Sequence, residues 1–340
     1  MIHADRLDGA VADAFAAVET ALAAGIPGAA LGVVTETGAR SVRFAGDAMR
    51  LPERLGLQRA MLFDLASLTK VILTTPTMLR LVEAGALQRG LEEPLARLVP
   101  DLHQYDLAHP VRSLTVRQCL AHLSGLPAVV PLYSWGNDPR TLKANLLQRD
   151  WELAAPVYSD INFMLLGIAI ERLTGQPLTS RIPPGFHATP GPGNAVATEH
   201  CRWRERVLRG EVHDENAFAL GGLAGHAGLF GSVDAVLNFA LGLLDGSGMS
   251  HASLAAMREP QSATRALGWE RRHAGWTGGQ ACSPDTLGHT GFTGTGLWID
   301  FAGGYGWTLL TNRVHPSRHV ETGIQALRRE VGERLARSLS

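Results

Sequence analysis

A serine and a lysine stand three residues apart in the segment FDLASLTK, as Ser67 and Lys70. On a helix, residues with this spacing share a face, so the lysine amine can reach the serine hydroxyl. A serine hydroxyl is a weak nucleophile unless a neighbouring base takes its proton. A lysine can be that base only when burial lowers its pKa from about 10.4 to about 7 or 8. The pair therefore predicts a nucleophilic serine beside a buried, neutral lysine.

The composition of the chain supports this interpretation. Among its 31 lysine and arginine residues, only Lys70 and Lys143 are lysines. Arginine keeps its proton at physiological pH, whereas a lysine amine can titrate. The chain thus has one of its few titratable amines where acid–base chemistry would require one.

The residues after Lys70, from Val71 to Val82, are apolar on nearly every side of a helix. This pattern is typical of a buried central helix. Its first turn would direct unpaired N–H groups and the positive end of the helix dipole at Ser67. Because Pro76 lacks a backbone N–H, we expect a kink or another irregularity there.

Three more segments follow in order: LAHLSGLP at 120–127, Tyr158-Ser159-Asp160, and Gly288-His289-Thr290-Gly291. Together with the serine and lysine, they resemble serine β-lactamases of the class C type and the related D-alanyl-D-alanine peptidases and esterases, over nearly the whole chain. The resemblance implies that Ser67 forms an acyl-enzyme and that Lys70 and Tyr158 move its protons. Through a hydrogen bond to the lysine, the phenol can protonate the leaving group and later activate water.

The resemblance also implies a binding site around the serine. The N–H groups of Ser67 and Phe292 would form an oxyanion hole. Thr290 and Gly291 would lie on a strand along the cleft. Tyr133 offers chemistry similar to that of Tyr158, but it follows the SGLP segment, and we expect it in the wall that contacts the substrate.

Two positions depart from the family pattern. Asp160, a position expected to contact the substrate, replaces the usual asparagine, so a carboxylate that only accepts hydrogen bonds stands where an amide would both donate to and accept from a substrate. His289 replaces a lysine, which removes a permanent cation for the carboxylate of a penicillin or a terminal D-alanine. His289 would bind a carboxylate only below its pKa of about 6.5. We therefore do not expect efficient β-lactam hydrolysis.

Residues 201–232, CRWRERVLRGEVHDENAFALGGLAGHAGLFGS, are similar to a subgroup that includes peptidoglycan-fragment amidases and low-molecular-weight penicillin-binding hydrolases. His213, Asp214 and His226 do not complete a recognisable metal-ligand pattern, so we expect no metal and no cofactor. We expect His226 to line the cleft from a tight glycine-rich loop. His122 is interpreted as a structural core histidine.

The two ends of the chain have similar patterns. A helical pattern over 9–24 precedes two strand-like runs at 28–35 and 41–48, and two more strand-like runs at 295–301 and 306–313 precede an amphipathic helix at 321–339. The intervening residues are mostly helical in pattern. We predict an α+β fold of the β-lactamase/transpeptidase type, with an antiparallel sheet built from both chain ends and flanked by helices. Residues 1–70 and 266–340 would form the α/β lobe and 71–265 a mostly helical lobe, with the active site between them.

Composition and charge exclude several classes of protein. The formal net charge is −1, without a basic stripe, which argues against a nucleic-acid partner. No apolar run is long enough to span a membrane, and the N-terminal residues do not resemble a signal peptide. The cysteines, Cys119, Cys201 and Cys282, fit neither a disulfide framework nor a metal knuckle. We therefore expect a cytoplasmic protein with reduced thiols.

These observations predict a serine hydrolase whose partner is a small acyl substrate: a muropeptide, an ester or a lactam. Our first hypothesis is a peptidase or amidase that acts on peptidoglycan-derived fragments. A carboxylesterase, or a weak β-lactamase, of the same family is the alternative. A non-catalytic ligand-binding module is a third hypothesis, and the presence of the serine, the lysine and the tyrosine argues against it.

Overall fold

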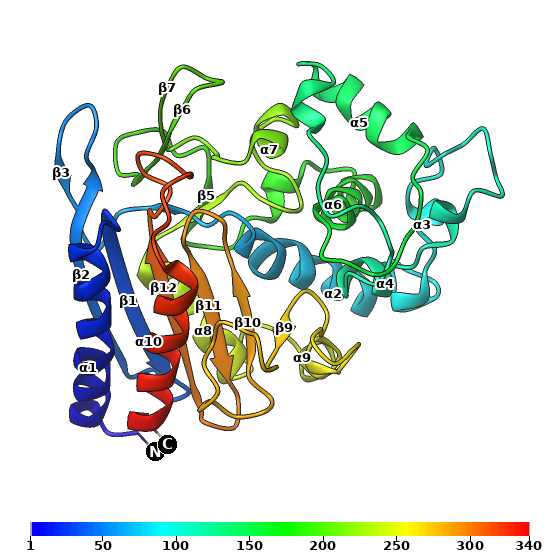
Figure 1. The fold of residues 1–340 in the computed structure, drawn as a ribbon. Helices are drawn as coiled ribbons and strands as arrows, with labels where there is room; N and C mark the ends of the chain where they lie inside the picture. The colour runs from blue at the N-terminus through cyan, green and yellow to red at the C-terminus, as the bar shows by residue number, and fades with distance from the viewer. Residues whose placement is uncertain (1, 340) are drawn as a thin grey trace.

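Strands from the two ends of the chain pair at the centre of the main sheet (Figure 1). The structure, a computed structural model, describes residues 2–339. β1 (Gly28–Thr35) and β12 (Tyr305–Thr311) are antiparallel, with Ala29 opposite Thr311 and Thr35 opposite Tyr305. Every residue of both strands is buried, because helices cover both faces of the sheet.

In the part of the chain that the structure describes, the main sheet has the strand order β3-β2-β1-β12-β11-β10-β9. Its other strands are β2 (Arg40–Met49), β3 (Leu55–Gly56), β9 (Glu270–Arg271), β10 (Leu287–Thr290) and β11 (Gly296–Asp300). All neighbouring pairs are antiparallel. A small sheet contains β4 (Phe63–Asp64), β8 (Leu229–Gly231) and β5 (Phe186–Ala188), and a hairpin contains β6 (Ala197–Cys201) and β7 (Arg206–Arg209).

Two layers of helix enclose the main sheet. α1 (Ala4–Ala23) and α10 (Ile324–Leu339) lie side by side over one face (Figure 1), and their apolar side chains share a cluster with Leu31 and Val33 of β1. α8 (Val233–Leu244) packs on the opposite face, where Val34 of β1 belongs to a second cluster. Successive strand residues point to opposite faces, so β1 contributes to both cores.

The other helices lie beyond the β9–β10 edge of the sheet (Figure 1). They are α2 (Thr75–Glu83), α3 (Leu95–Leu98), α4 (Val116–Leu120), α5 (Pro139–Gln148), α6 (Asp160–Thr174), α7 (Glu215–Ala219) and α9 (His251–Arg258). A π-helical segment, Lys70–Thr74, precedes α2 and confirms the irregularity expected near Pro76. No helix within residues 2–339 is long and apolar enough to cross a membrane.

The predicted α+β fold, with a sheet from both chain ends and a helical insertion, is confirmed. α8 is the exception to the expected pattern, because it lies inside the segment 71–265 and yet packs on the sheet. Its buried residues, among them Val233 and Leu237, cover β1 and β12. The division into lobes at residues 70 and 266 stays a prediction.

Candidate active site

Ser67 lies in a tight turn between β4 and the central helix. Ala66, just before it, has a φ of 47°, a left-handed conformation that is strained for a residue with a Cβ. The buried carboxylate of Asp64 holds the turn. Its Oδ1 accepts the N–H of Ala66 at 2.8 Å, and its Oδ2 accepts the N–H of His213 at 2.6 Å. These bonds fix the serine at the start of the helix, beside the segment that contains His213.

Lys70 is fully buried, one helical turn after Ser67. Its Nζ donates to Ser67 Oγ at 2.8 Å and to the carbonyl oxygen of His226 at 3.2 Å. The same Nζ lies 2.8 Å from Asp160 Oδ1, in an ion pair. The structure therefore brings the serine and the lysine together as the sequence predicts.

The charge of Lys70 differs from the expectation. Burial favours the neutral amine, but the nearby Asp160 carboxylate and the Tyr158 hydroxyl outweigh it and raise the pKa of Lys70. Lys70 is therefore an ammonium in the free enzyme. The raised pKa contradicts the predicted neutral lysine base, and its cause is the Asp160 carboxylate paired with the amine. Asp160 also lines the cavity, as predicted for a residue that contacts substrate.

Tyr158 completes the group. Lys70 Nζ lies 5.0 Å from the centroid of the Tyr158 ring. Burial raises the pKa of this phenol although the Lys70 charge opposes the change. His122 supports Tyr158 from behind, with ring centroids 4.3 Å apart, and its Nδ1 accepts the N–H of Ser159 at 3.0 Å. Burial lowers the pKa of His122 well below its usual value, so it is a neutral core residue that positions the start of α6.

The turn after β10 lies against the Ser67 turn. Thr293 Oγ1 donates to the Asp64 carbonyl at 2.7 Å, and Thr295 Oγ1 donates to the Leu65 carbonyl at 3.1 Å. A Cβ at Gly291 would overlap Thr295 Oγ1 and lie 2.6 Å from the Leu65 oxygen, so this close approach requires glycine.

The oxyanion hole predicted at this turn has its two donors free. Among the described residues, the backbone N–H groups of Ser67 and Phe292 have no hydrogen-bond acceptor. Two unpaired N–H donors beside a nucleophile can stabilise a developing oxyanion. That role stays a prediction.

His289 and Thr290 line the cavity, as predicted, but His289 cannot act as a cation near neutral pH. Burial, with Lys70 and Arg265 nearby, lowers the pKa of His289 well below its usual value. Because Nδ1 must donate to the Thr290 carbonyl, 3.0 Å away, Nε2 is unprotonated, and this buried nitrogen has no hydrogen-bond partner within residues 2–339. The expectation that a charged His289 binds a carboxylate weakly is therefore wrong. His289 is neutral, and its free ring nitrogen can only accept a hydrogen bond.

His226 and Tyr133 do not line the cavity. The His226 side chain is buried, with Nε2 2.9 Å from Asp214 Oδ1, and it reaches the site only through the carbonyl that accepts from Lys70. Burial alone would raise the pKa of Asp214. The charge of His226 and its hydrogen bond to Asp214 have the larger effect, so the pKa of Asp214 is lowered. Tyr133 packs instead on Trp203, with ring centroids 5.0 Å apart, outside the cavity that holds Ser67.

The cavity above Ser67 has a volume of about 740 Å³ and is lined by several charged side chains. Arg318 is paired with Glu199 and Glu215. Arg328, buried, donates to the carbonyls of Gly291 and Thr295 at 2.9 and 2.7 Å. The guanidinium groups of Arg265 and Arg329 have no hydrogen bond or ion pair in the part of the chain that the structure describes.

No sequence motif marks these arginines. Arg265 lies beside the ring of Tyr158, 5.4 Å from its centroid, but it belongs to no motif. The role of Asp64 could have been predicted from the sequence, because aspartate side chains commonly accept a hydrogen bond from the backbone two residues later and so stabilise a turn.

Two groups of side chains have metal-ligand chemistry. His213 Nε2 and Glu199 Oε2 are 3.1 Å apart, separate from the His226–Asp214 pair, so His213, Asp214 and His226 do not converge on one point.

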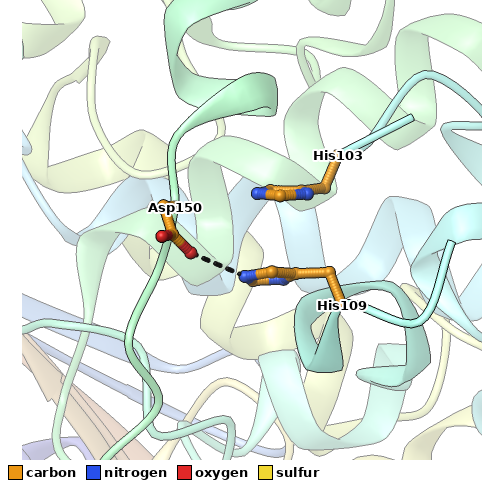
Figure 2. Close-up of side chains that lie close together, drawn as sticks. All are labelled: His103, His109 and Asp150. Atoms are coloured by element: carbon orange, nitrogen blue, oxygen red, sulfur yellow. Dashed lines mark hydrogen bonds and ion pairs between the residues drawn. The ribbon is translucent and has the colours of Figure 1, made fainter. Parts of the chain in front are cut away.

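The second group, His103, His109 and Asp150, has its ligand atoms within 4.8 Å of one another (Figure 2). Because His109 Nδ1 accepts the Val111 N–H at 3.3 Å, its Nε2 carries the proton and donates to Asp150 at 3.0 Å. A protonated nitrogen does not bind a metal, so we interpret this group as a hydrogen-bonded loop contact.

A family profile described as Beta-lactamase matches residues 15–330. The chain is 32% identical to the N-acetylmuramyl-L-alanine amidase of Bacillus subtilis, over 88% of this chain and 80% of that protein. It is 29% identical to a putative D-alanyl-D-alanine carboxypeptidase of Salmonella agona, over 75% and 70%. The solved structure of EstCE1, described as a hydrolase with promiscuous acyltransferase activity, has the same fold, with a TM-score of 0.73, 22% identity and coverage of 96% and 99%.

Proposed function

The chain belongs to the beta-lactamase family of serine hydrolases, and we propose that it is an amidase or peptidase that cleaves peptidoglycan-derived fragments through an acyl-enzyme on Ser67. The observation that carries this proposal is the hydrogen bond between Ser67 and Lys70, with Tyr158 beside the Lys70 amine, where Ser67 and Tyr158 line the cavity. The names of the amidase and carboxypeptidase relatives support the substrate class.

In this mechanism, Tyr158 relays the proton because Lys70 is already an ammonium. In one concerted step, Tyr158 gives its phenol proton to the leaving nitrogen while its oxygen takes the proton of Ser67 Oγ, which attacks the carbonyl carbon. The C–N bond breaks with the proton on the nitrogen, and Tyr158 ends the step as a neutral phenol. Water repeats the sequence in reverse: its proton passes to the Tyr158 oxygen, and the phenol proton returns to Ser67 Oγ as the ester bond breaks. Lys70 stabilises the partial negative charge that develops on the phenol oxygen while its proton is leaving.

The tetrahedral intermediate carries its charge on the former carbonyl oxygen. The free N–H groups of Ser67 and Phe292 would donate hydrogen bonds to this oxygen, each stabilising it by about 3 to 4 kcal/mol. Arg328 holds the turn that contains Phe292 through the Gly291 and Thr295 carbonyls. Arg328, which lies on α10, therefore positions the Phe292 N–H as one of the two donors.

Charge at the cavity indicates a carboxylate on the substrate. Arg265 is an unpaired cation beside Tyr158, and Arg329 is a second unpaired cation on the lining. Peptide fragments of the cell wall end in carboxylates, which arginine binds well. Because neutral His289 cannot pair with a carboxylate, we propose that Arg265 binds the carboxylate of the substrate.

A carboxylesterase is the second candidate function. The absence of a permanent cation at position 289 favours it, because a simple ester needs no carboxylate contact. Both candidates would use the same acyl-enzyme and need no metal or cofactor. The cytoplasmic location stays part of the proposal, and the buried, unpaired Cys119, Cys201 and Cys282 are consistent with a reducing compartment.

A substrate panel separates the two candidates. We would compare kcat/KM for an N-acetylmuramyl-L-alanyl peptide, an acyl-D-alanyl-D-alanine peptide and p-nitrophenyl butyrate, with the Ser67→Ala variant as the blank. The proposal predicts release of a free amine from at least one peptide, with kcat/KM at or above that for the ester. Rapid ester cleavage with no amine release above the Ser67→Ala blank would contradict the proposal and favour the esterase.

A further inference from the structure

Three aromatic side chains gather outside the cavity, and we call Tyr133, Trp203 and Phe218 the aromatic rim. The Trp203 ring centroid lies 5.0 Å from that of Tyr133 and 5.8 Å from that of Phe218, which meets it edge-on. Trp203 is 48% exposed and Phe218 38% exposed. Large exposed aromatic groups in contact with one another are uncommon on a surface without a binding role.

Buried polar contacts hold the aromatic rim in place. The guanidinium of Arg204 lies 4.1 Å from the Phe218 centroid and 5.5 Å from that of Trp203. This guanidinium is buried and donates to the carbonyls of Val212 and His213, at 2.6 and 2.9 Å. The rings are therefore fixed before a ligand arrives, which reduces the entropic cost of binding.

Two segments join the aromatic rim to the cavity. Phe218 lies on α7, one turn after Glu215, which lines the cavity. On the other side, Val129 lines the cavity, and the chain runs from it to Tyr133, whose N–H donates to Asn216 Oδ1 of α7 at 3.1 Å. A substrate bound at Ser67 can thus extend over α7 onto the rings.

The distribution of charge indicates which part of the substrate lies there. At the α7 end of the cavity, Asp214 is paired with His226 and Glu215 with Arg318. The unpaired cations Arg265 and Arg329 belong to other parts of the lining, on the segment before β9 and on α10. A carboxylate-bearing peptide therefore has its partners away from α7. The apolar, charge-balanced rim suits an uncharged group.

We propose that the aromatic rim binds a pyranose ring of the substrate, the glycan part of a muropeptide whose scissile amide lies at Ser67. A pyranose has an apolar C–H face that packs on an aromatic ring, and its hydroxyl groups remain in contact with water or with the indole N–H and phenol O–H groups. This inference rests on the proposed function, because the sugar belongs to the acyl part of the same substrate, on the carbonyl side of the scissile amide.

The test compares two ligands that share the amide and differ in the sugar: N-acetylmuramyl-L-alanyl-D-isoglutamine and D-lactoyl-L-alanyl-D-isoglutamine. Calorimetry with Ser67→Ala removes any turnover. We expect the muramyl ligand to bind about tenfold more tightly than the lactoyl ligand, a ratio typical of one well-packed aromatic contact. In Ser67→Ala/Trp203→Ala that ratio should fall to about one, while Ser67→Ala/Trp203→Phe should keep most of it.

Tyr105, an exposed tyrosine with 90% of its surface accessible, provides the matched control, and Tyr105→Ala should leave the ratio unchanged. If Trp203→Ala lowers the melting temperature, Trp203→Leu is the second variant, because it keeps an apolar side chain without an aromatic face. It should also bind the muramyl and the lactoyl ligand with equal affinity. An equal affinity of Ser67→Ala for both ligands, or a ratio that survives in Trp203→Ala and Trp203→Leu, overturns the inference. Failure of the proposed function is a separate result, because it would appear as absence of amine release by the wild-type enzyme while binding by Ser67→Ala is still measured.

Discussion

At the scale of single residues, the charge of Lys70 depends on burial and on its neighbours. Burial alone would make the amine neutral, as in many lysine bases. Asp160 lies 2.8 Å from Nζ and stabilises the ammonium. In the proposed mechanism, the carboxylate at position 160 therefore changes which group accepts the serine proton, and Tyr158 acts as the relay.

Asp160→Asn tests this role through pH. Without the carboxylate, burial is no longer offset, so the pKa of Lys70 should fall. Because the account requires the ammonium, activity should be lost at a lower pH than in wild type, and the alkaline limb of the kcat/KM profile should move towards neutrality. Asp150→Asn, which changes an exposed carboxylate, is the control. An unmoved alkaline limb would show that Asp160 does not set the charge.

Arg265→Ala tests the assignment of the substrate carboxylate. The KM for a peptide with a free terminal carboxylate should rise by roughly 10- to 100-fold, the usual loss for a charge-assisted pair, with a much smaller change in kcat. The same peptide with an amidated terminus should be unaffected. Arg265→Lys should recover part of the affinity. Equal losses for the free and amidated peptides would remove Arg265 from this role.

At the scale of elements, two turns that are distant in sequence determine the geometry of the site. The turn that contains Ala66 and Ser67 is held by Asp64, and the turn after β10 is fastened to it by Thr293 and Thr295. These contacts place the Phe292 N–H near the serine.

Gly291→Ala should disturb this contact. A Cβ would overlap Thr295 Oγ1 and press on the Leu65 carbonyl, so the two turns must separate. We expect kcat to fall by about 10²- to 10³-fold, the effect of losing one oxyanion donor, while the far-ultraviolet circular dichroism stays near wild type. Gly193→Ala is the control, because a Cβ there would meet nothing within 4 Å. Wild-type kcat in Gly291→Ala would exclude a tight turn as the source of the donor.

The sequence predicted the parts of the site that depend on local pattern. Ser67 and Lys70 share a helix face, and their contact follows from spacing alone. The charge of Lys70 could not be predicted in the same way, because it depends on a carboxylate 90 positions later in the chain. Arg328 was missed for a similar reason: its hydrogen bonds reach from α10 to a turn after β10, and no short motif encodes that approach. His226 was expected in the cleft, but its side chain turns inward to Asp214.

At the scale of the whole molecule, the sheet depends on both chain ends. β1 and β12 pair at its centre, and α1 and α10 cover one face together. The site lies where the turns after β4 and β10 meet the start of α6. Loss of the α1–α10 layer would therefore affect the folding of the entire chain and not only its ends.

Leu335→Ala examines this dependence. Leu335 is fully buried in the cluster between α10 and the sheet. Truncation should lower the free energy of unfolding by about 2 to 5 kcal/mol, as cavity-forming substitutions do. Chemical denaturation measures it, with the exposed Arg337→Ala as the control. If Leu335→Ala lowers the free energy of unfolding by less than Arg337→Ala does, α10 contributes little to the stability of the sheet.

Glu199 connects β6 to the loop after β12 and to the segment before α7. Burial opposes its charge, but hydrogen bonds from His213 and Arg318 outweigh it and lower the pKa of Glu199 from 4.5 to about 2. A lowered pKa stabilises the fold above the unfolded value, and this contribution disappears as the pH falls from about 4.5 towards 2. Glu199→Gln should therefore lower the melting temperature at pH 7, and the difference from wild type should narrow over that acid range. A difference that is constant with pH would mean that the charge of Glu199 is not responsible.

The central claim is that Ser67 is the nucleophile of an enzyme whose proton relay is already assembled. Intact-mass spectrometry after incubation with a fluorophosphonate, followed by peptide mapping, tests it directly. We predict one adduct per wild-type chain, located on Ser67, no adduct on Ser67→Ala, and labelling of Tyr158→Phe slowed by at least about 10²-fold, as expected when an acid–base group is removed. A folded wild-type protein that stays unlabelled, or Ser67→Ala labelled at the wild-type rate, would contradict the account.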